Sequence, residues 1–66
     1  MQIVLNGEPV AVADGSSVAD LVGVLGLQGQ RVAVELNGDI VSRSRWTEMR
    51  LKDGDHAEIV RAIGGG

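Results

Sequence analysis

The sequence contains no cysteine, and this absence excludes two ways of stabilising a small protein. Disulfide bonds cannot form, and no zinc ion can be held by thiolates. Phenylalanine and tyrosine are also absent, and Trp46 is the only aromatic residue. A domain as short as these 66 residues buries only about 60% of the surface that its unfolded chain exposes. The core must therefore come from aliphatic side chains around a single tryptophan.

Long apolar runs and a surplus of positive charge are missing as well. No run approaches the roughly 18–20 apolar residues that cross a bilayer, and no basic segment followed by an apolar one opens the chain. We therefore expect a cytoplasmic protein that does not act at a membrane. The formal net charge is -3, which argues against nucleic acid as a partner, because phosphate binding needs a cationic face. Arg43, Arg45 and Arg50 form a small cluster that we interpret as a solvated loop.

Two strands are predicted at the start of the chain. Residues 1–6 alternate with a period of two, and Asn6-Gly7 is a strong signal for a tight hairpin turn. Residues 10–13 follow as the returning strand, with Pro9 at its start, where a missing N–H costs little. The residues expected on the buried face are Met1, Ile3 and Leu5.

A helix is predicted next. Ser17 followed three residues later by Asp20 resembles a capping box. Apolar residues then recur at i, i+3, i+4 and i+7, which predicts a helix of about ten residues with one buried stripe. Gly26 fits the left-handed position that ends such a helix, with Leu27 packing back on the last turn. The stripe consists of Val18, Leu21, Val22 and Leu25.

The second half of the chain predicts further strands and turns. Residues 31–36 alternate, Asn37-Gly38 is a second tight turn, and residues 40–41 can form a short strand. Residues 42–48 read as an irregular segment or a helical turn around Trp46, which we expect to cover the core. The remaining elements are an extended piece at 49–51, a turn at 52–55 and a last strand at 57–62 with Ala57 and Ile59 on one face.

This order of elements predicts a two-layer α+β domain over residues 1–66. One helix covers one face of a single mixed sheet, and a right-handed crossover lays the last strand parallel to the first. That is the β-grasp architecture. We expect the helix stripe to pack against Ile3, Leu5, Val34 and Ile59, and residues 63–66 to form an exposed tail.

A conventional active site is hard to build from these residues. His56 is the only histidine, and no serine or cysteine nucleophile pairs with it, so we expect a solvated side chain. Asp53 and Asp55 flank Gly54 in a pattern typical of a turn, and they are too few for a calcium loop. We likewise do not interpret Ser16, Ser17 or Lys52 as attachment points for a carried group. The expectation is no catalytic residue, no metal site and no cofactor bound by this chain.

The glycine-rich end of the sequence is the feature that packing does not explain. Gly64, Gly65 and Gly66 carry maximal backbone entropy, and the simplest interpretation is a frayed end. However, residues without a Cβ atom can thread a narrow channel, and residues 63–66 fully extended span roughly 13 Å. Adenylation by ATP in a partner enzyme would make a terminal carboxylate an electrophile. In a chain without cysteine, that carboxyl carbon is the natural place to mount a sulfur atom.

The whole chain resembles the ThiS family, the thiamin-pathway sulfur carriers of the ubiquitin-like β-grasp superfamily. The matching segments follow the family's order and lie within residues 31–66, a stretch that is more than half of the sequence. The chain departs from the family at Ser42, where many relatives have proline. The segments that carry it are 31–38, 43–46, 53–55, 58–60 and 64–66.

The resemblance implies that the chain is a protein cosubstrate rather than an enzyme. An adenylating, E1-like enzyme would use Mg and ATP to activate Gly66, and a sulfur donor such as a cysteine desulfurase would convert it to a thiocarboxylate. Thiazole synthase would then accept the sulfur. Gly66 is the expected reactive residue and Gly65 gives access to partner active sites, whereas the need for Gly64 stays open.

Three alternatives remain at this point: a molybdopterin-type sulfur carrier, a β-grasp interaction module with an inert tail, and a modifier that attaches to lysines through its terminus. The sequence also leaves open whether the product is thiamin or another sulfur-containing metabolite, which donor supplies the sulfur, and the oligomeric state.

Overall fold

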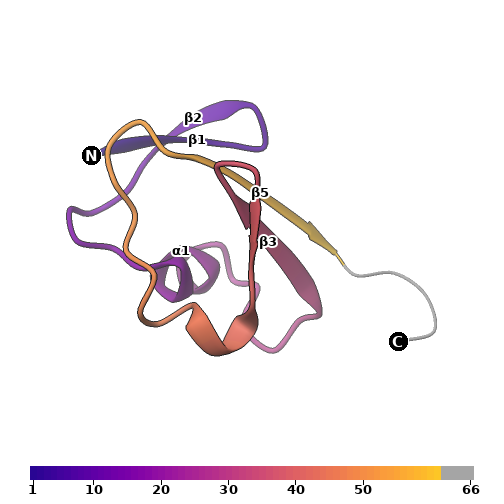
Figure 1. Cartoon of the computed structure of the whole chain (residues 1–66). Helices are drawn as coiled ribbons and strands as arrows, with labels where there is room; N and C mark the ends of the chain where they lie inside the picture. The colour runs from indigo at the N-terminus through magenta and orange to yellow at the C-terminus, as the bar shows by residue number, and fades with distance from the viewer. Residues whose placement is uncertain (62–66) are drawn as a thin grey trace.

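The computed structural model describes residues 1–61, which contain five strands, one α-helix and one 3₁₀ turn. The strands form one sheet in the order β2-β1-β5-β3-β4, in which only the pair β1 and β5 is parallel. Figure 1 shows β5 running through the middle of this sheet. The predicted α+β β-grasp arrangement, with the first and last strands adjacent and parallel, is confirmed. In chain order the elements are β1 (Gln2–Leu5), β2 (Glu8–Ala11), α1 (Val18–Val24), β3 (Val32–Leu36), β4 (Asp39–Val41), the 3₁₀ turn η1 (Arg43–Arg45) and β5 (His56–Arg61).

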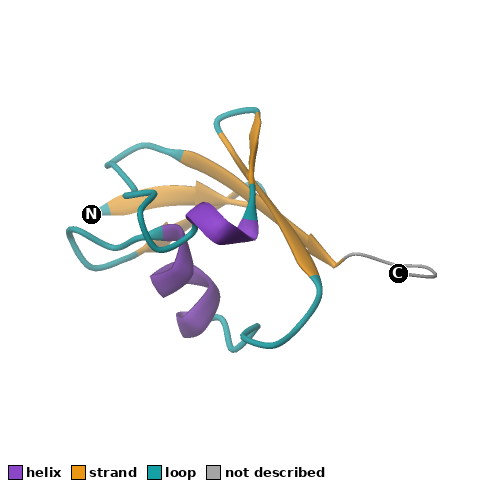
Figure 2. Ribbon diagram, turned by 60° about the horizontal axis from the view of Figure 1, so that its bottom comes forward, coloured by secondary structure: helices purple, strands orange, loops and turns teal. Residues whose placement is uncertain are grey.

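The described residues form two layers, because both helical segments lie on the same side of the sheet (Figure 2). We call the face toward α1 the inner face and the opposite one the outer face. Alternate strand residues point to each face, so the inner face collects the apolar half of every strand pattern. The buried core is Ile3, Leu5, Val18, Leu21, Val22, Val32, Val34, Leu36, Val41, Trp46, Leu51, Ala57 and Ile59.

Both predicted Asn-Gly turns close two-residue hairpins. Asn6 and Gly7 have φ angles of 50° and 85°, and Asn37 and Gly38 have 51° and 91°. A turn of this kind needs positive φ at both central residues, which asparagine and glycine tolerate best. Strand β2 begins at Glu8, earlier than the predicted residues 10–13, because so short a turn pairs Leu5 with Glu8 at once. Pro9 therefore lies within a strand, at the edge of the sheet, where proline is allowed.

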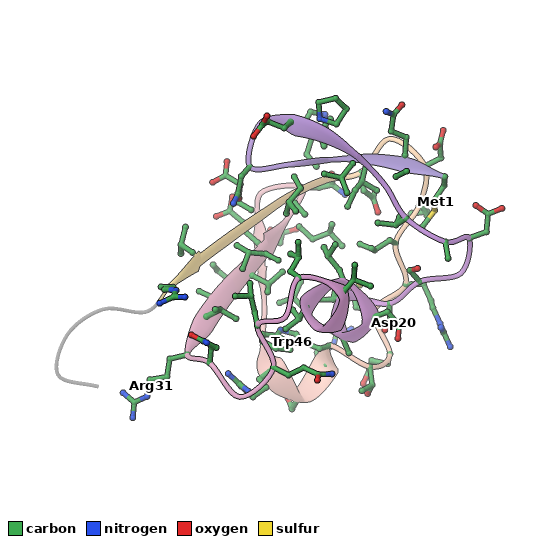
Figure 3. All side chains as sticks on the ribbon, turned by 180° about the vertical axis from the view of Figure 1, so that it is seen from behind. Met1, Asp20, Arg31 and Trp46 are labelled. Carbon is green, nitrogen blue, oxygen red and sulfur yellow. The ribbon has the colours of Figure 1, made fainter. Side chains whose placement is uncertain are left out.

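The start of α1 has the predicted capping box. The backbone N–H of Asp20 donates to Ser17 Oγ at 3.1 Å, and the Ser17 N–H donates to Asp20 Oδ2 at 2.9 Å. The hydrogen bond that the Ser17 N–H donates holds the pKa of the Asp20 carboxyl below its usual value. Asp20 lies at the exposed start of the helix (Figure 3). Two of the four orphan N–H groups around a helix start are thereby satisfied by side chains.

The end of α1 differs from the prediction. The helix stops at Val24 after seven residues, and Leu25 is its C-cap with 39% of its surface exposed. The prediction that Leu25 belongs to the buried stripe is therefore wrong. The Leu27 N–H donates to the Val22 carbonyl and the Gly26 N–H to the Gly23 carbonyl, which is the Schellman motif. Gly26 has the expected left-handed φ of 72°, and this reversal packs Leu27 against the core in place of Leu25.

Trp46 covers the lower core, as predicted (Figure 3). Its side chain follows η1 and is only 7% exposed, and its Nε1–H donates to the Val41 carbonyl at 2.9 Å. The Arg43 guanidinium lies 4.8 Å from the centre of the ring on its solvent side. The extended piece predicted at residues 49–51 is reduced to a single bridge between Ser17 and Arg50, which ties this segment to the start of α1.

Within residues 1–61, no helix has both the length and the apolar character needed to span a bilayer.

Candidate functional site

The central strand β5 is the element that leads into the predicted site. It pairs with β1 on one side and with β3 on the other, and the pairing with β3 extends to its last residue, where Arg61 lies opposite Val32. The strand begins at His56, one residue before the predicted start, because His56 pairs with Val4 of β1. Arg61, the last described residue, therefore ends a strand that lies between β1 and β3 and not at an edge of the sheet.

Two asparagine side chains hold β5 in place from opposite sides. Asn6 Oδ1 accepts a hydrogen bond from the Ile59 N–H at 2.9 Å, and Asn6 Nδ2 donates to the Ile59 carbonyl at 3.2 Å. On the other side, Asn37 Oδ1 accepts a hydrogen bond from the His56 N–H at 2.9 Å. Each asparagine therefore forms a hairpin turn and also continues the hydrogen-bonding ladder onto the central strand.

Sequence reasoning assigned these asparagines only to the turns. A signal for the second role was available, because the tripeptide Leu-Asn-Gly occurs twice, at residues 5–7 and 36–38. Aspartate or glycine would also serve a turn of this type, but only asparagine offers both a donor and an acceptor to a neighbouring strand. The repeated asparagine is therefore explained by its side-chain hydrogen bonds to β5 as well as by the turn.

The predicted site residues Gly64, Gly65 and Gly66, and the predicted tail 63–66, lie outside the described residues. Their roles stay predictions. What the structure does establish is the strand from which they continue.

The other titratable residues singled out from the sequence are Asp53, Asp55 and His56, which lie in or next to the turn at 52–55. Asp53 accepts a hydrogen bond from the Gln2 N–H at 2.8 Å. Asp55 is buried and accepts from the Lys52 N–H at 2.7 Å and from Asn37 Nδ2 at 3.1 Å. Both carboxylates thus hold the turn at 52–55, as predicted, while His56 is exposed. Among residues 1–61 there is no group of three or more His, Asp or Glu side chains placed to hold a metal ion.

The outer face combines apolar residues with a pair of like charges. Glu35 and Glu58 lie directly opposite one another on β3 and β5, and the exposed side chains of Ile40 and Val60 flank them. Facing carboxylates are unfavourable for a sheet, so this arrangement is not explained by stability. It lies beside the strand that continues into residues 62–66.

Comparison with known proteins identifies the family. The model of the ThiS family matches residues 3–66. The chain belongs to the ThiS family. Sulfur carrier protein ThiS of Bacillus subtilis is 38% identical over 63 residues, which cover 94% of this chain and 96% of that protein. The crystal structure of the thiamine biosynthesis protein ThiS from Geobacter metallireducens superimposes with a TM-score of 0.87 at 36% identity, over 100% of both chains.

One group of relatives is much longer than this chain. Thiazole synthase of Paramagnetospirillum magneticum is 42% identical over 66 residues, which cover 100% of this chain and 20% of that protein. The chain thus spans about a fifth of the length of the thiazole synthase relatives that it matches. Together these findings confirm the predicted ThiS resemblance and the ubiquitin-like β-grasp fold, and they favour the ThiS family over the molybdopterin-type carriers.

Proposed function

We propose that this ThiS-family protein is a sulfur carrier for formation of the thiazole ring of thiamin, with the sulfur mounted on the carboxyl carbon of Gly66. The observation that carries the proposal is the family match, which extends through residue 66 and so includes all three glycines. The described structure supports it, because β5, the strand that precedes these residues in the chain, pairs with β1 on one side and with β3 on the other. We infer that residues 1–66 act as one domain with 63–66 as its tail.

The chemistry requires activation by a partner. A carboxylate resists nucleophilic attack, so an adenylating enzyme would join Gly66 to the AMP part of ATP and release pyrophosphate, with Mg held by that enzyme. The persulfide of a sulfur donor such as a cysteine desulfurase would then displace AMP and form an acyl disulfide, and a second thiol would break the S–S bond, becoming part of a disulfide and releasing the thiocarboxylate. The chain itself would act as a cosubstrate, without supplying a catalytic side chain or binding a cofactor. The need for ATP is consistent with a cytoplasmic location.

Thiazole synthase is the proposed acceptor of the sulfur. This chain matches a part of the longer thiazole synthase relatives, which supports direct contact between the sulfur carrier and thiazole synthase. The outer face beside β5, with Glu35 and Glu58, offers a surface on which a basic partner could rest while the tail is engaged. Glycine suits the tail because a chain without Cβ atoms fits a narrow active-site channel.

The decisive experiment follows sulfur onto the protein. Intact protein incubated with the adenylating enzyme, Mg, ATP and a sulfur donor should exchange one terminal oxygen for sulfur, as measured by intact-protein mass. Deleting Gly65 and Gly66 should abolish ATP–pyrophosphate exchange, because the carboxylate no longer reaches the nucleotide. Gly65→Val should behave similarly through steric exclusion. The melting temperature of both variants should match that of the parent, because the changes lie beyond the packed strands.

Two outcomes would contradict the proposal. If the truncated protein still supports pyrophosphate exchange, or the intact protein never gains sulfur, an interaction module with an inert tail is the better account. Recovery of the chain joined to lysine side chains of other proteins would instead support a modifier. A thiocarboxylate that serves molybdopterin synthase and not thiazole synthase would assign the chain to a different product.

A further inference from the structure

A groove of about 490 Å³ lies between the β3–β4 hairpin and the segment that follows η1. Ile40 on the hairpin and Met49 on the opposite segment give it apolar walls. Arg45, Arg50 and Lys52 supply positive charge along the second wall. The groove is thus amphipathic, with aliphatic surface and three cations within reach of one occupant.

The positive charge of the groove contrasts with the rest of the chain. Residues 43–52 contain four of the six basic residues and only one of the nine acidic residues. A protein with a formal net charge of -3 therefore places three of its six basic residues in the lining of one groove. Such a separation of charge attracts an anionic partner to that side and repels it elsewhere.

The groove cations keep hydrogen-bonding capacity for an outside partner. Arg45 lies 3.7 Å from Glu48 in a pair with both side chains exposed, which is a weak interaction. Arg50 uses one guanidinium nitrogen to donate to the Gly15 carbonyl at 2.9 Å. Lys52 is exposed and takes part in neither of the ion pairs among residues 1–61. Arginine retains several donors in a fork that matches a carboxylate.

The shape and charge of the lining favour a peptide over a free phosphate. Asp39 and Asp55 also line the groove, so its formal charge is reduced from +3 to +1 and a dianion would meet carboxylates as well as cations. Strand β4 is an edge strand. Its register places Ile40 opposite Glu35, between the pair Leu36–Asp39 and the pair Val34–Val41. In a two-residue hairpin this position directs the backbone N–H and C=O away from β3, where an extended chain can pair with them.

We propose that this groove is a docking site for an extended, acidic segment of a protein partner, with aliphatic side chains on Ile40 and Met49 and carboxylates on Arg45, Arg50 and Lys52. The groove lies at the start of β5, where Asp55 lines it, whereas residues 62–66 continue from the other end of that strand (Figure 1). Six strand residues separate the two ends by about 17 Å. The site does not depend on sulfur chemistry at Gly66 and can be occupied while the tail is engaged.

The test titrates the isotope-labelled protein with a short synthetic peptide of alternating glutamate and leucine, followed by amide chemical shifts in NMR spectra. Saturable shifts should centre on Ile40, Met49, Arg50 and Lys52, and the affinity should fall as salt is added. A peptide in which glutamine replaces glutamate keeps the shape without the charge, and it should bind far more weakly.

Charge reversal with a matched control separates the groove from general attraction. The double variant Arg45→Glu, Lys52→Glu should weaken peptide binding by about tenfold. The control double variant Arg31→Glu, Arg61→Glu changes the net charge equally at two exposed positions outside the groove, and Arg31 points away from the body of the molecule (Figure 3). It should change the affinity by less than about twofold, because distant exposed charges are screened. All four positions are exposed, so both variants should keep the spectrum of the folded protein.

Several results would overturn the proposal. They are the absence of saturable shifts, an equal loss of affinity in the control variant, and shifts centred on Glu35, Glu58 and Val60 without shifts at Met49, Arg50 and Lys52. Competition by inorganic phosphate at constant ionic strength would assign the groove to small anions instead. Shifts of the same amides with protein concentration, in the absence of peptide, would assign it to a second copy of this chain.

Discussion

The two faces of the sheet differ although the same strands build both. On β5, Ile59 points to the inner face and is 7% exposed, while its neighbour Val60 points to the outer face and is 56% exposed. The buried strand residues of the inner face are all aliphatic, whereas Glu35 and Glu58 lie opposite one another on the outer face. The difference shows that one period-two pattern serves two purposes: the inner residues stabilise the fold, and the outer residues remain available to partners.

The cause of this difference is the covering layer. The helix α1 and the side chain of Trp46 lie on the inner side, and no helix among residues 1–61 covers the outer side (Figure 2). Apolar area removed from water stabilises a fold by about 25 cal/mol per Å². Substitutions on the two sides should therefore differ in their effect on the free energy of unfolding.

The largest effect is expected for Trp46→Ala, which removes the cover of the lower core. Loss of the ring leaves a cavity, and the Val41 carbonyl loses the hydrogen bond that it accepts from Nε1. The free energy of unfolding should fall by about 3–5 kcal/mol. That is a large share of the roughly 5–15 kcal/mol that stabilises a domain. Urea unfolding followed by circular dichroism measures it. A cost below about 1 kcal/mol, as for a surface site, would show that the ring is not part of the core.

Neighbouring residues on β5 give the most direct test of the two faces. Ile59→Ala should lower the free energy of unfolding by about 2–5 kcal/mol, because it creates a cavity beneath α1. Val60→Ala is its matched control on the same strand and should cost less than about 1 kcal/mol. Both are measured by chemical unfolding. Equal costs would mean that the outer face contributes to stability as much as the inner one.

The capping box controls how firmly the covering helix is attached. Ser17→Ala removes the hydroxyl that accepts from Asp20, and it should cost about 0.5–2 kcal/mol. Thermal unfolding at neutral pH measures this cost. Substitution of Ser16, whose hydroxyl bonds only the Ala13 carbonyl in an exposed loop, is the control and should cost less.

The same cap predicts a dependence on pH. The folded protein lowers the pKa of Asp20 from 3.8, so the carboxylate contributes stability above that value and loses it as the pH falls through the lower folded pKa. The stability difference between the parent and Asp20→Ala should therefore be constant near neutral pH and should shrink below pH 3.8. A difference that stays constant into the acid range would show that the charge of Asp20 does not matter.

The smallest effect is expected on the outer face, and it has the opposite sign. Glu58→Gln removes one of two facing charges and should stabilise the protein by about 0.2–1 kcal/mol. The gain should shrink as salt screens the repulsion. Thermal unfolding at low and high salt measures both. A loss of stability on this substitution would show that the two carboxylates are not a source of strain in the sheet.

Most of the fold was predictable from the sequence because its signals are local. Alternation defined the strands, and Asn6-Gly7 and Asn37-Gly38 defined the hairpins, since positive φ at two successive positions leaves few other choices. Ser17 and Asp20 marked the helix start through a contact only three residues long. These features need no information from distant parts of the chain.

The features that sequence reasoning missed have two kinds of cause. The exposure of Leu25 is local, because the Schellman motif at Gly26 ends the helix before Leu25 reaches the core. The others depend on distant residues. The side chain of Asn6 reaches Ile59, more than fifty positions away, to complete the ladder on β5. The groove beside β4 likewise joins a hairpin to a segment that follows it.

The sequence by itself therefore determined the elements, their order and the family, and it singled out Gly66 as the residue proposed to carry sulfur. Only the tertiary structure decided how β5 is held at the centre of the sheet and where the cations of residues 43–52 meet an apolar wall. The physical reason is that turn and strand preferences act between neighbours, whereas burial and surface charge arise only when distant segments come together.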